Sequence, residues 1–215
     1  MDANDKKVPE VVIRRLPRYY RYLDELDREG KTRISSTALS KKMGVTASQI
    51  RQDFNYFGGF GQQGYGYNVR HLLTELKKLL GISKGYKTVI VGAGNLGHAL
   101  ANYAGLKKRG FKVVGIFDND PEKIGRKIGD IEISDVCGIV EFINENKIDI
   151  AILTLPKSAT EEVAEKLIKS GIKGLWNFSF TELCANDSVF VENVHLTDSL
   201  MTLSFKMSQK DKKRN

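Results

Sequence analysis

Val89-Ile90-Val91-Gly92-Ala93-Gly94-Asn95-Leu96-Gly97 decides the fold of the larger part of this chain. A run of apolar, β-branched residues leads into G-x-G-x-x-G, and a helical pattern follows, which is the arrangement of a dinucleotide-binding turn. Gly92 permits the tight turn, Gly94 lets the backbone approach a pyrophosphate, and Gly97 lets the helix pack closely on the strand. The N-terminus of that helix offers N–H donors to phosphates. The predicted nucleotide-binding residues here are Gly92, Ala93, Gly94, Asn95, Leu96 and Gly97.

A second strand, Val113 to Asp118, ends in an acid somewhat more than 20 residues beyond these glycines. A carboxylate at that distance accepts the hydroxyls of a ribose and repels a 2′-phosphate. No Arg directly follows Asp118. The pattern therefore predicts NADH and NAD+ rather than their phosphorylated forms, and Asp118 and Asn119 join the predicted nucleotide-binding residues. Asp118 to Pro121 also has the composition of a simple turn, and the same residues can be both.

From Tyr86 onward the pattern alternates between strands and helices. Strands are predicted at 87–91, 112–117, 148–153, 173–177 and 189–191, and helices at 95–108, 136–146 and 158–170. Such alternation indicates an α/β fold with a parallel sheet covered on both faces. Ligands bind at the carboxyl ends of such strands, so Thr154, Leu155, Pro156 and Asn177 are further candidates for the nucleotide site, although strand-end polar residues are often only caps and turns. A last apolar helix, from about Leu196, has no strand after it and fits either an oligomer contact or a cover for the local sheet edge.

The first 84 residues hold most of the net charge of +8: they carry 16 Lys and Arg against nine Asp and Glu, and the remainder carries 18 against 17. One amphipathic helix is predicted over 10–29, a short one through Leu39 and Met43, and a third from Ala47 to Tyr56. Gly44 and the N-cap residue Thr46 separate the last two. Helix, glycine-containing turn and helix in a basic region form a helix-turn-helix that can offset phosphate charge on DNA.

Gly58 to Tyr67 contains five glycines with interleaved aromatic residues, a composition that excludes a stable helix. The pattern suits a tight β-hairpin, the wing of a winged helix, or else a flexible loop. A helix over 69–80 closes the module, and Gly81 to Gly85 is a linker. The predicted domains are thus 1–84, a winged-helix DNA-binding domain, and 85–215, a Rossmann-like domain.

Composition excludes several classes of protein. No run approaches the 18 apolar residues of a membrane span, and Met1 to Lys7 lacks the apolar core of a signal peptide. Cys137 and Cys184 lie far apart, so neither a disulfide framework nor a metal site is indicated. We therefore expect a cytoplasmic protein. We also expect no catalytic site, because the roughly 130 residues after the linker are enough for a dinucleotide-binding fold and little more. The ligand is then a signal rather than a substrate.

The motifs Thr46 to Gly58, Gly64-Tyr65-Gly66-Tyr67 and Gly92 to Gly97 together resemble the Rex family of redox-sensing transcriptional repressors. Phe117-Asp118, Ala151 to Pro156, Gly171 to Gly174 and Val191 to Val194 extend this resemblance over nearly the whole chain. The resemblance implies a homodimer with a swapped C-terminal helix, bound to double-stranded DNA at an inverted-repeat operator. It also implies that NADH releases the operator and that NAD+ competes without doing so.

Carried onto matching positions, the family pattern adds Tyr103 near the nicotinamide. It also places a set of residues at the DNA or the domain interface: Arg15, Arg21, Ser48, Gln49, Arg51, Gln52, Tyr56, Gln62 and Gln63.

Three departures from the family pattern stand out. Gln52 and the pair Gln62-Gln63 occupy positions that are usually basic, which predicts a flatter salt dependence and a shifted operator preference. His195 replaces a usual acid of the interdomain switch, and Asp198 is a possible substitute.

Three other functions compete with this prediction. An NAD-dependent enzyme with an accessory DNA-binding domain would turn over NADH. A sensor of coenzyme A shares this type of fold but would not depend on Asp118. An architectural DNA-binding protein would respond to no ligand.

Overall fold

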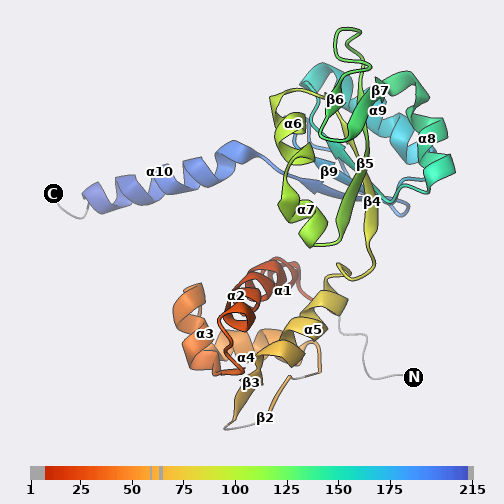
Figure 1. The fold of residues 1–215 in the computed structure, drawn as a ribbon. Coiled ribbons are helices and arrows are strands. Elements are labelled where there is room, and N and C mark those ends of the chain that lie inside the picture. The colour runs from red at the N-terminus through yellow and green to blue at the C-terminus, as the bar shows by residue number, and fades with distance from the viewer. Residues whose placement is uncertain (1–7, 59, 63–64, 213–215) are drawn as a thin grey trace. The chain divides into compact units, whose positions relative to one another are not determined.

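The structure, a computed structural model, describes residues 8–58, 60–62 and 65–212. The chain divides into two compact units, Met1–Lys84 and Gly85–Asn215 (Figure 1).

The N-terminal unit is a winged helix-turn-helix. Its helices are α1 (Glu10–Ile13), α2 (Leu16–Arg28), α3 (Ser36–Met43), α4 (Ala47–Asn55) and α5 (Val69–Leu79). Its strands β1 (Arg33–Ile34), β2 (Gly61–Gln62) and β3 (Gly66–Asn68) form an antiparallel sheet in the order β1-β3-β2. Gly61 pairs with Tyr67 and Gln62 with Gly66, so the predicted hairpin is confirmed. Its flexible-loop alternative is wrong for these residues.

Side-chain caps define the turn between α3 and α4. The Ser35 hydroxyl accepts a hydrogen bond from the Ala38 N–H at 3.0 Å, and the Thr46 hydroxyl accepts one from the Gln49 N–H at 3.1 Å. Between them Gly44 adopts a φ of 66°, a left-handed conformation that ends α3. Gly44 and Thr46 are the residues at which the sequence places the end of the first of these helices and the start of the second. One core, containing Tyr19, Leu39, Ile50, Phe54 and Leu72 among others, then fixes the helices on one another.

The single helix predicted over 10–29 is wrong, because the chain breaks between α1 and α2 at Arg14 and Arg15. Pro17 provides the physical reason. It has no N–H, and its ring would clash with the carbonyl of residue 13 in a continuous helix. In the first turn of α2 the missing N–H costs nothing, so a new helix starts there.

The C-terminal unit is a seven-stranded sheet of order β10-β9-β8-β4-β5-β7-β6. Its strands are β4 (Tyr86–Val91), β5 (Phe111–Asp118), β6 (Lys127–Ile128), β7 (Ile131–Asp135), β8 (Ile150–Leu153), β9 (Gly174–Asn177) and β10 (Phe190–Asn193). All pairings are parallel except that of β6 with β7. The helices are α6 (Asn95–Ala101), α7 (Ala104–Lys108), α8 (Ile139–Asn146) and α9 (Lys157–Lys169), with a 3₁₀ turn at Val136–Gly138 before α8.

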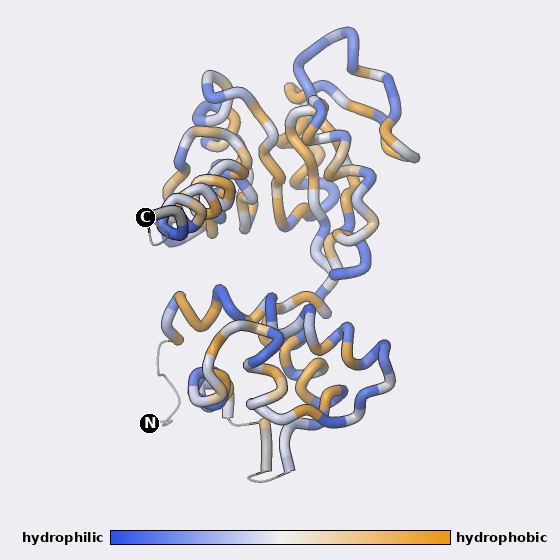
Figure 2. Tube along the Cα trace, turned by 90° about the vertical axis from the view of Figure 1, so that its left-hand side faces the viewer, coloured by the Kyte–Doolittle hydropathy of each residue, from blue (hydrophilic) through white to orange (hydrophobic). Residues whose placement is uncertain are grey.

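Helices cover both faces of this sheet, as its apolar strands predict. Val89 and Val91 point into one core with residues of α8 and α9, whereas Ile90 points into a second core with residues of α6 and α7. Figure 1 shows these helix pairs on opposite sides, and Figure 2 shows the hydrophobic colour concentrated on the central strands. Alternate residues of β4 therefore serve two cores.

Two predictions in this unit need correction. The helix expected over 95–108 is two helices, since Asn102 and Tyr103 interrupt it and Tyr103 has an extended ψ of 97°. Strands β6 and β7 were absent from the predicted elements. β6 is an edge strand of only two residues, so it carries no periodic pattern to detect.

The last helix, α10 (Leu196–Lys212), leaves its apolar residues uncovered (blue in Figure 1). Every side chain from Leu196 to Lys210 is exposed. The large apolar ones among them are Leu196, Leu200, Met201, Leu203, Phe205 and Met207. The helix thus does not cover the edge of its own sheet, which removes that alternative.

Candidate nucleotide and nucleic-acid sites

A cavity of about 600 Å³ opens at the carboxyl ends of β4, β5 and β8. The sheet order reverses here, because β5 and β8 lie on opposite sides of β4. Ligands of open α/β sheets bind at such a switch point. The predicted residues that line the cavity are Gly92, Gly94, Asp118, Asn119, Thr154, Leu155 and Pro156.

The glycine turn has the geometry that its sequence predicts. Gly92 has a φ of 104°, and a Cβ there would lie 2.6 Å from the Thr154 carbonyl oxygen. A Cβ at Gly97 would lie 2.0 Å from the Gly92 carbonyl oxygen, so α6 could not approach the strand. At Gly94, by contrast, a Cβ would meet no atom within 4 Å. Two glycines are required by packing, and the third faces open space at the cavity.

Asp118 closes the strand that follows and is held by three donors. Its Oδ2 accepts a hydrogen bond from the Ala93 N–H at 2.6 Å, and its Oδ1 accepts one from the Asp120 N–H at 2.9 Å. The Lys123 ammonium lies 3.2 Å from Oδ2. Burial by itself would raise the pKa of Asp118, but these donors outweigh it and hold the pKa below its usual value. The carboxylate is therefore ionised and faces the cavity.

Other predicted residues lie outside the cavity lining. Asn95, Leu96 and Gly97 form the first turn of α6. Asn177 is buried, and its amide nitrogen donates to the Thr181 carbonyl oxygen at 2.7 Å and to the Asn193 Oδ1 at 2.8 Å. Asn177 thus fixes the loop after β9 in this structure.

Tyr103, the residue placed near the nicotinamide by resemblance, is also outside that lining. Its side chain is 55% exposed. A Cβ at Gly105 would lie 2.3 Å from the Tyr103 Cζ, so the ring folds over the Gly105 backbone. Because Gly105 has no side chain, the Tyr103 ring can occupy this space.

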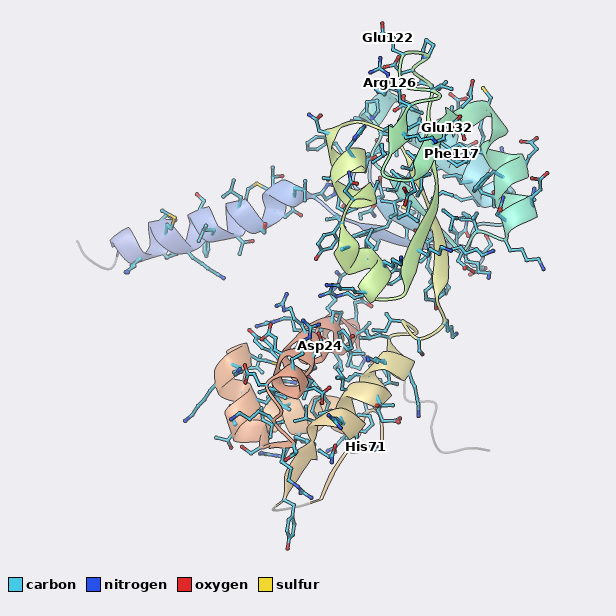
Figure 3. All side chains as sticks on the ribbon, viewed as in Figure 1. Asp24, His71, Phe117, Glu122, Arg126 and Glu132 are labelled. Carbon is cyan, nitrogen blue, oxygen red and sulfur yellow. The ribbon has the colours of Figure 1, made fainter. Side chains whose placement is uncertain are left out.

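Sequence reasoning missed several residues of the cavity. Lys123, Glu162 and Lys166 supply its charged rim, and apolar residues such as Val136 and Val140 supply its wall. Lys123 stands in the loop after β5, in which Glu122 and Arg126 are labelled in Figure 3 beyond Phe117. No spacing rule marks a lysine in such a loop. The positions of Glu162 and Lys166, one turn apart on α9, could have been found from helical periodicity once Pro156 was placed.

In the N-terminal unit, α4 presents a polar surface. Ser48, Arg51 and Gln52 are exposed, and Gln49 and Tyr56 are half-buried. The Arg51 guanidinium donates to the Ser36 hydroxyl at 3.0 Å. Ser48, Gln49, Arg51 and Gln52 share α4, as the sequence predicts, and Tyr56 is its C-cap residue.

The other predicted DNA contacts are more varied. Arg15 directs its guanidinium to Asp53 rather than to solvent, with Nε 2.6 Å from Oδ2 and Nη2 2.7 Å from Oδ1. Arg21 is exposed, and its guanidinium lies 5.7 Å from the centre of the Tyr22 ring. Gln62 lies in β2, while Gln63 is outside the described residues.

His195, the departure at the switch position, lies with its Nε2 3.5 Å from the Glu182 Oε1. Asp198 is exposed in the first turn of α10. Within residues 8–58, 60–62 and 65–212, no cluster of three or more His, Cys, Asp or Glu could hold a metal ion. None of the helices in that part of the chain is long and apolar enough to cross a bilayer.

Two family models match the chain. Residues 7–55 match "Putative DNA-binding protein N-terminus", and residues 83–181 match "CoA binding domain". A protein of Thermoanaerobacter pseudethanolicus named redox-sensing transcriptional repressor Rex is 55% identical over 205 residues, covering 95% of this chain and 92% of the relative. Its namesake in Clostridioides difficile is 53% identical over 205 residues, covering 95% and 98%.

Solved structures match over the same extent. RSP in complex with β-NAD+ and operator DNA superposes with a TM-score of 0.90 at 53% identity, covering 98% of this chain and 97% of the other. RSP in complex with β-NADH superposes with a TM-score of 0.90 at 50% identity, covering 98% of this chain and 99% of the other. A further structure, with a TM-score of 0.89 at 52% identity over 96% and 97%, is described as RSP, a Rex-family repressor. The chain therefore belongs to the Rex family of redox-sensing transcriptional repressors.

Proposed function

We propose that this protein is a homodimeric repressor that binds an inverted-repeat operator and releases it when NADH enters the cavity of the C-terminal unit. One observation carries the proposal: a winged helix and a dinucleotide cavity with an ionised Asp118 occur in one chain. RSP, its structural relative, has been solved with β-NADH and with β-NAD+ and operator DNA. Since such a protein binds DNA, we place it in the cytoplasm.

In the cavity, the residues present fit an unphosphorylated dinucleotide. Gly94 leaves room for a pyrophosphate beside the backbone, and Asp118 offers its carboxylate to the ribose hydroxyls. The apolar wall formed by Val136, Ile139 and Val140 suits an adenine ring. When bound, the nicotinamide supplies the redox state that is sensed, and Tyr103 is the residue we assign to sensing it.

On DNA, α4 is the recognition helix. Its N-terminal residues, Ser48 and Gln49, lie where helix-turn-helix proteins contact base edges. Arg51 and Gln52 follow on the exposed side, and the hairpin of β2 and β3 is the wing. Arg21 is available for phosphate or the domain interface.

The apolar side chains of α10 support the homodimer. Leu196, Leu200, Leu203 and Met207 share one side of the helix by their spacing, and all are more than half exposed. An exposed apolar surface of this size marks an interaction site. In the proposed dimer, the helix is swapped into the partner subunit, which covers that surface.

Like the repressors of its family, the protein is a regulator and not an enzyme. The match of residues 83–181 to a coenzyme A-binding domain keeps coenzyme A as the second candidate ligand. The two ligands differ at Asp118, because removal of this carboxylate should weaken NADH binding and leave coenzyme A binding largely unaffected.

The test is binding of the purified protein to a labelled duplex with an inverted repeat, titrated at fixed salt with NADH, NAD+, NADPH and coenzyme A separately. Release by NADH alone, reversed by excess NAD+, is the expected result. Release by coenzyme A alone would make coenzyme A, and not NADH, the regulatory ligand. A response to none of the four would leave an architectural DNA-binding protein, and turnover of NADH with a carbonyl compound would make it an enzyme.

A further inference from the structure

A buried carboxylate joins the recognition helix to α2. Asp53, on α4, is fully buried and accepts four hydrogen bonds. The Arg15 guanidinium donates two, the Tyr19 hydroxyl donates one to Oδ2 at 2.7 Å, and the Gln49 amide nitrogen donates one to Oδ1 at 3.1 Å. A buried charge is tolerated only when paired and hydrogen-bonded in this way.

The chemistry of this cluster fixes the orientation of the Gln49 amide. An ionised carboxylate only accepts hydrogen bonds, so the group that faces Asp53 must be the NH₂ and not the carbonyl oxygen. Burial would raise the pKa of Asp53, but its bonds with Arg15, Tyr19 and Gln49 lower the pKa overall, and the group stays ionised at neutral pH.

This orientation leaves Gln49 with a defined set of free atoms. One N–H of its NH₂ is used on Asp53, which leaves one N–H donor and the Oε1 acceptor. One donor and one acceptor complement the N7 acceptor and N6 donor of adenine in the major groove. Gln49 is half-buried at the start of α4, beside the exposed Ser48, so part of its side chain is accessible on that side of the helix.

We propose that Asp53 is a positioning residue for sequence readout, which holds the Gln49 amide in the orientation that selects adenine at one base pair of each half-site. The inference rests on the proposed function in that α4 must enter the groove. It adds that specificity at this base pair is set by a residue that touches no DNA.

The experiment compares full-length wild type with Asp53→Asn, Gln49→Met and the double variant. A duplex selected from a pool randomised over an inverted repeat is the probe, and each base pair of its half-site is then changed symmetrically in turn. We expect Gln49→Met to lose discrimination at one base pair by about tenfold. We expect Asp53→Asn to lose it at the same base pair, and the double variant to lose no more than either.

The matched control is Asp24→Asn. Asp24 is an acid on α2, labelled in Figure 3, whose partner is the exposed Arg28. Its substitution should leave the discrimination profile unchanged. If Asp53→Asn weakens binding to every duplex equally, Asp53 is only a structural ion pair and the inference is overturned.

A second measurement needs no variant and remains available if Asp53→Asn does not fold. In NMR spectra of the wild-type protein, the inference requires a Gln49 side-chain NH₂ with one proton shifted and coupled through a hydrogen bond to the Asp53 carboxyl carbon. Free-rotation shifts for both protons would overturn it. Failure of the proposed function looks different, because the wild type would then select no sequence from the pool.

Discussion

We predict that one carboxylate, Asp118, determines which nucleotides the cavity accepts. We expect Asp118→Asn to weaken NADH binding by about tenfold or more, because a hydrogen bond to a charged group contributes about 1.5–3 kcal/mol. The loss should be smaller for NADPH, whose 2′-phosphate no longer meets a negative charge. Fluorescence titration of both nucleotides measures the ratio, with Asp130→Asn, an exposed acid outside the cavity lining, as the control. Equal losses for both nucleotides would remove Asp118 from discrimination.

The second prediction concerns the dependence of stability on pH at Asp53. Its pKa is lower in the folded than in the unfolded chain, so its stabilisation is complete above the unfolded value of about 3.9 and is lost as the pH falls through the folded value. The difference in thermal unfolding between wild type and Asp53→Asn should therefore be largest from neutral pH down to about pH 5, and it should shrink as the pH falls below about 4. A difference that stays constant over this range would mean that the carboxylate gains nothing from Arg15 and Tyr19.

At the next scale, the turn between β4 and α6 allows its structural and ligand-binding glycines to be separated. Gly97→Ala forces a Cβ to 2.0 Å from the Gly92 carbonyl oxygen, so we expect a lower melting temperature by several degrees, with weaker NADH binding as a consequence. Gly94→Ala meets no protein atom within 4 Å. It should keep the melting temperature of wild type and still weaken NADH binding, because the methyl group occupies the space of the pyrophosphate. Calorimetry and nucleotide titration on the two variants check both statements; a normal NADH affinity in Gly94→Ala would contradict this placement of the ligand.

Which elements could be predicted depended on whether local signals agreed with tertiary packing. The caps Thr46 and Gly44 and the continuous apolar run of strand β4 were predictable, because hydrogen-bonding capacity and local hydrophobicity act within a few residues. The break at Arg14 was missed because the apolar period continues across it, although Pro17 marks it physically. In the nucleotide cavity, the glycine turn after β4 and Asp118 could be predicted from their spacing in the sequence. Lys123 did not, since its position depends on how the loop after β5 folds back.

For the whole molecule, the apolar side of α10 predicts that assembly and function are lost together. We expect Leu200→Glu with Leu203→Glu to yield a monomer that binds a single half-site weakly, because each side chain removed from water contributes about 1.5–3 kcal/mol. Sedimentation velocity measures the mass, and Thr202→Glu, on another side of the same helix, is the control. A double variant that remains dimeric would place the interface elsewhere.

A repressor that is released by a ligand must also release the ligand when it binds DNA. If NADH weakens operator binding a hundredfold, which corresponds to about 2.7 kcal/mol, saturating operator must weaken NADH binding by the same factor. Isothermal titration of NADH into the free protein and into the operator complex gives both numbers. Equal affinities would contradict coupling between the two units, even if each binds its own ligand.

The hydrogen bond from the Ala93 N–H to Asp118 also limits how this protein can change its ligand. The acid that we expect to repel a 2′-phosphate is the same group that accepts the hydrogen bond from the glycine turn. Replacing it with a neutral or basic residue should therefore loosen the turn that the new ligand also needs. A single substitution of Asp118 that favours NADPH would therefore weaken the binding of both nucleotides, because both need the ordered turn. Any route to a phosphorylated cofactor, by evolution or by engineering, must first supply the turn with another acceptor for that N–H.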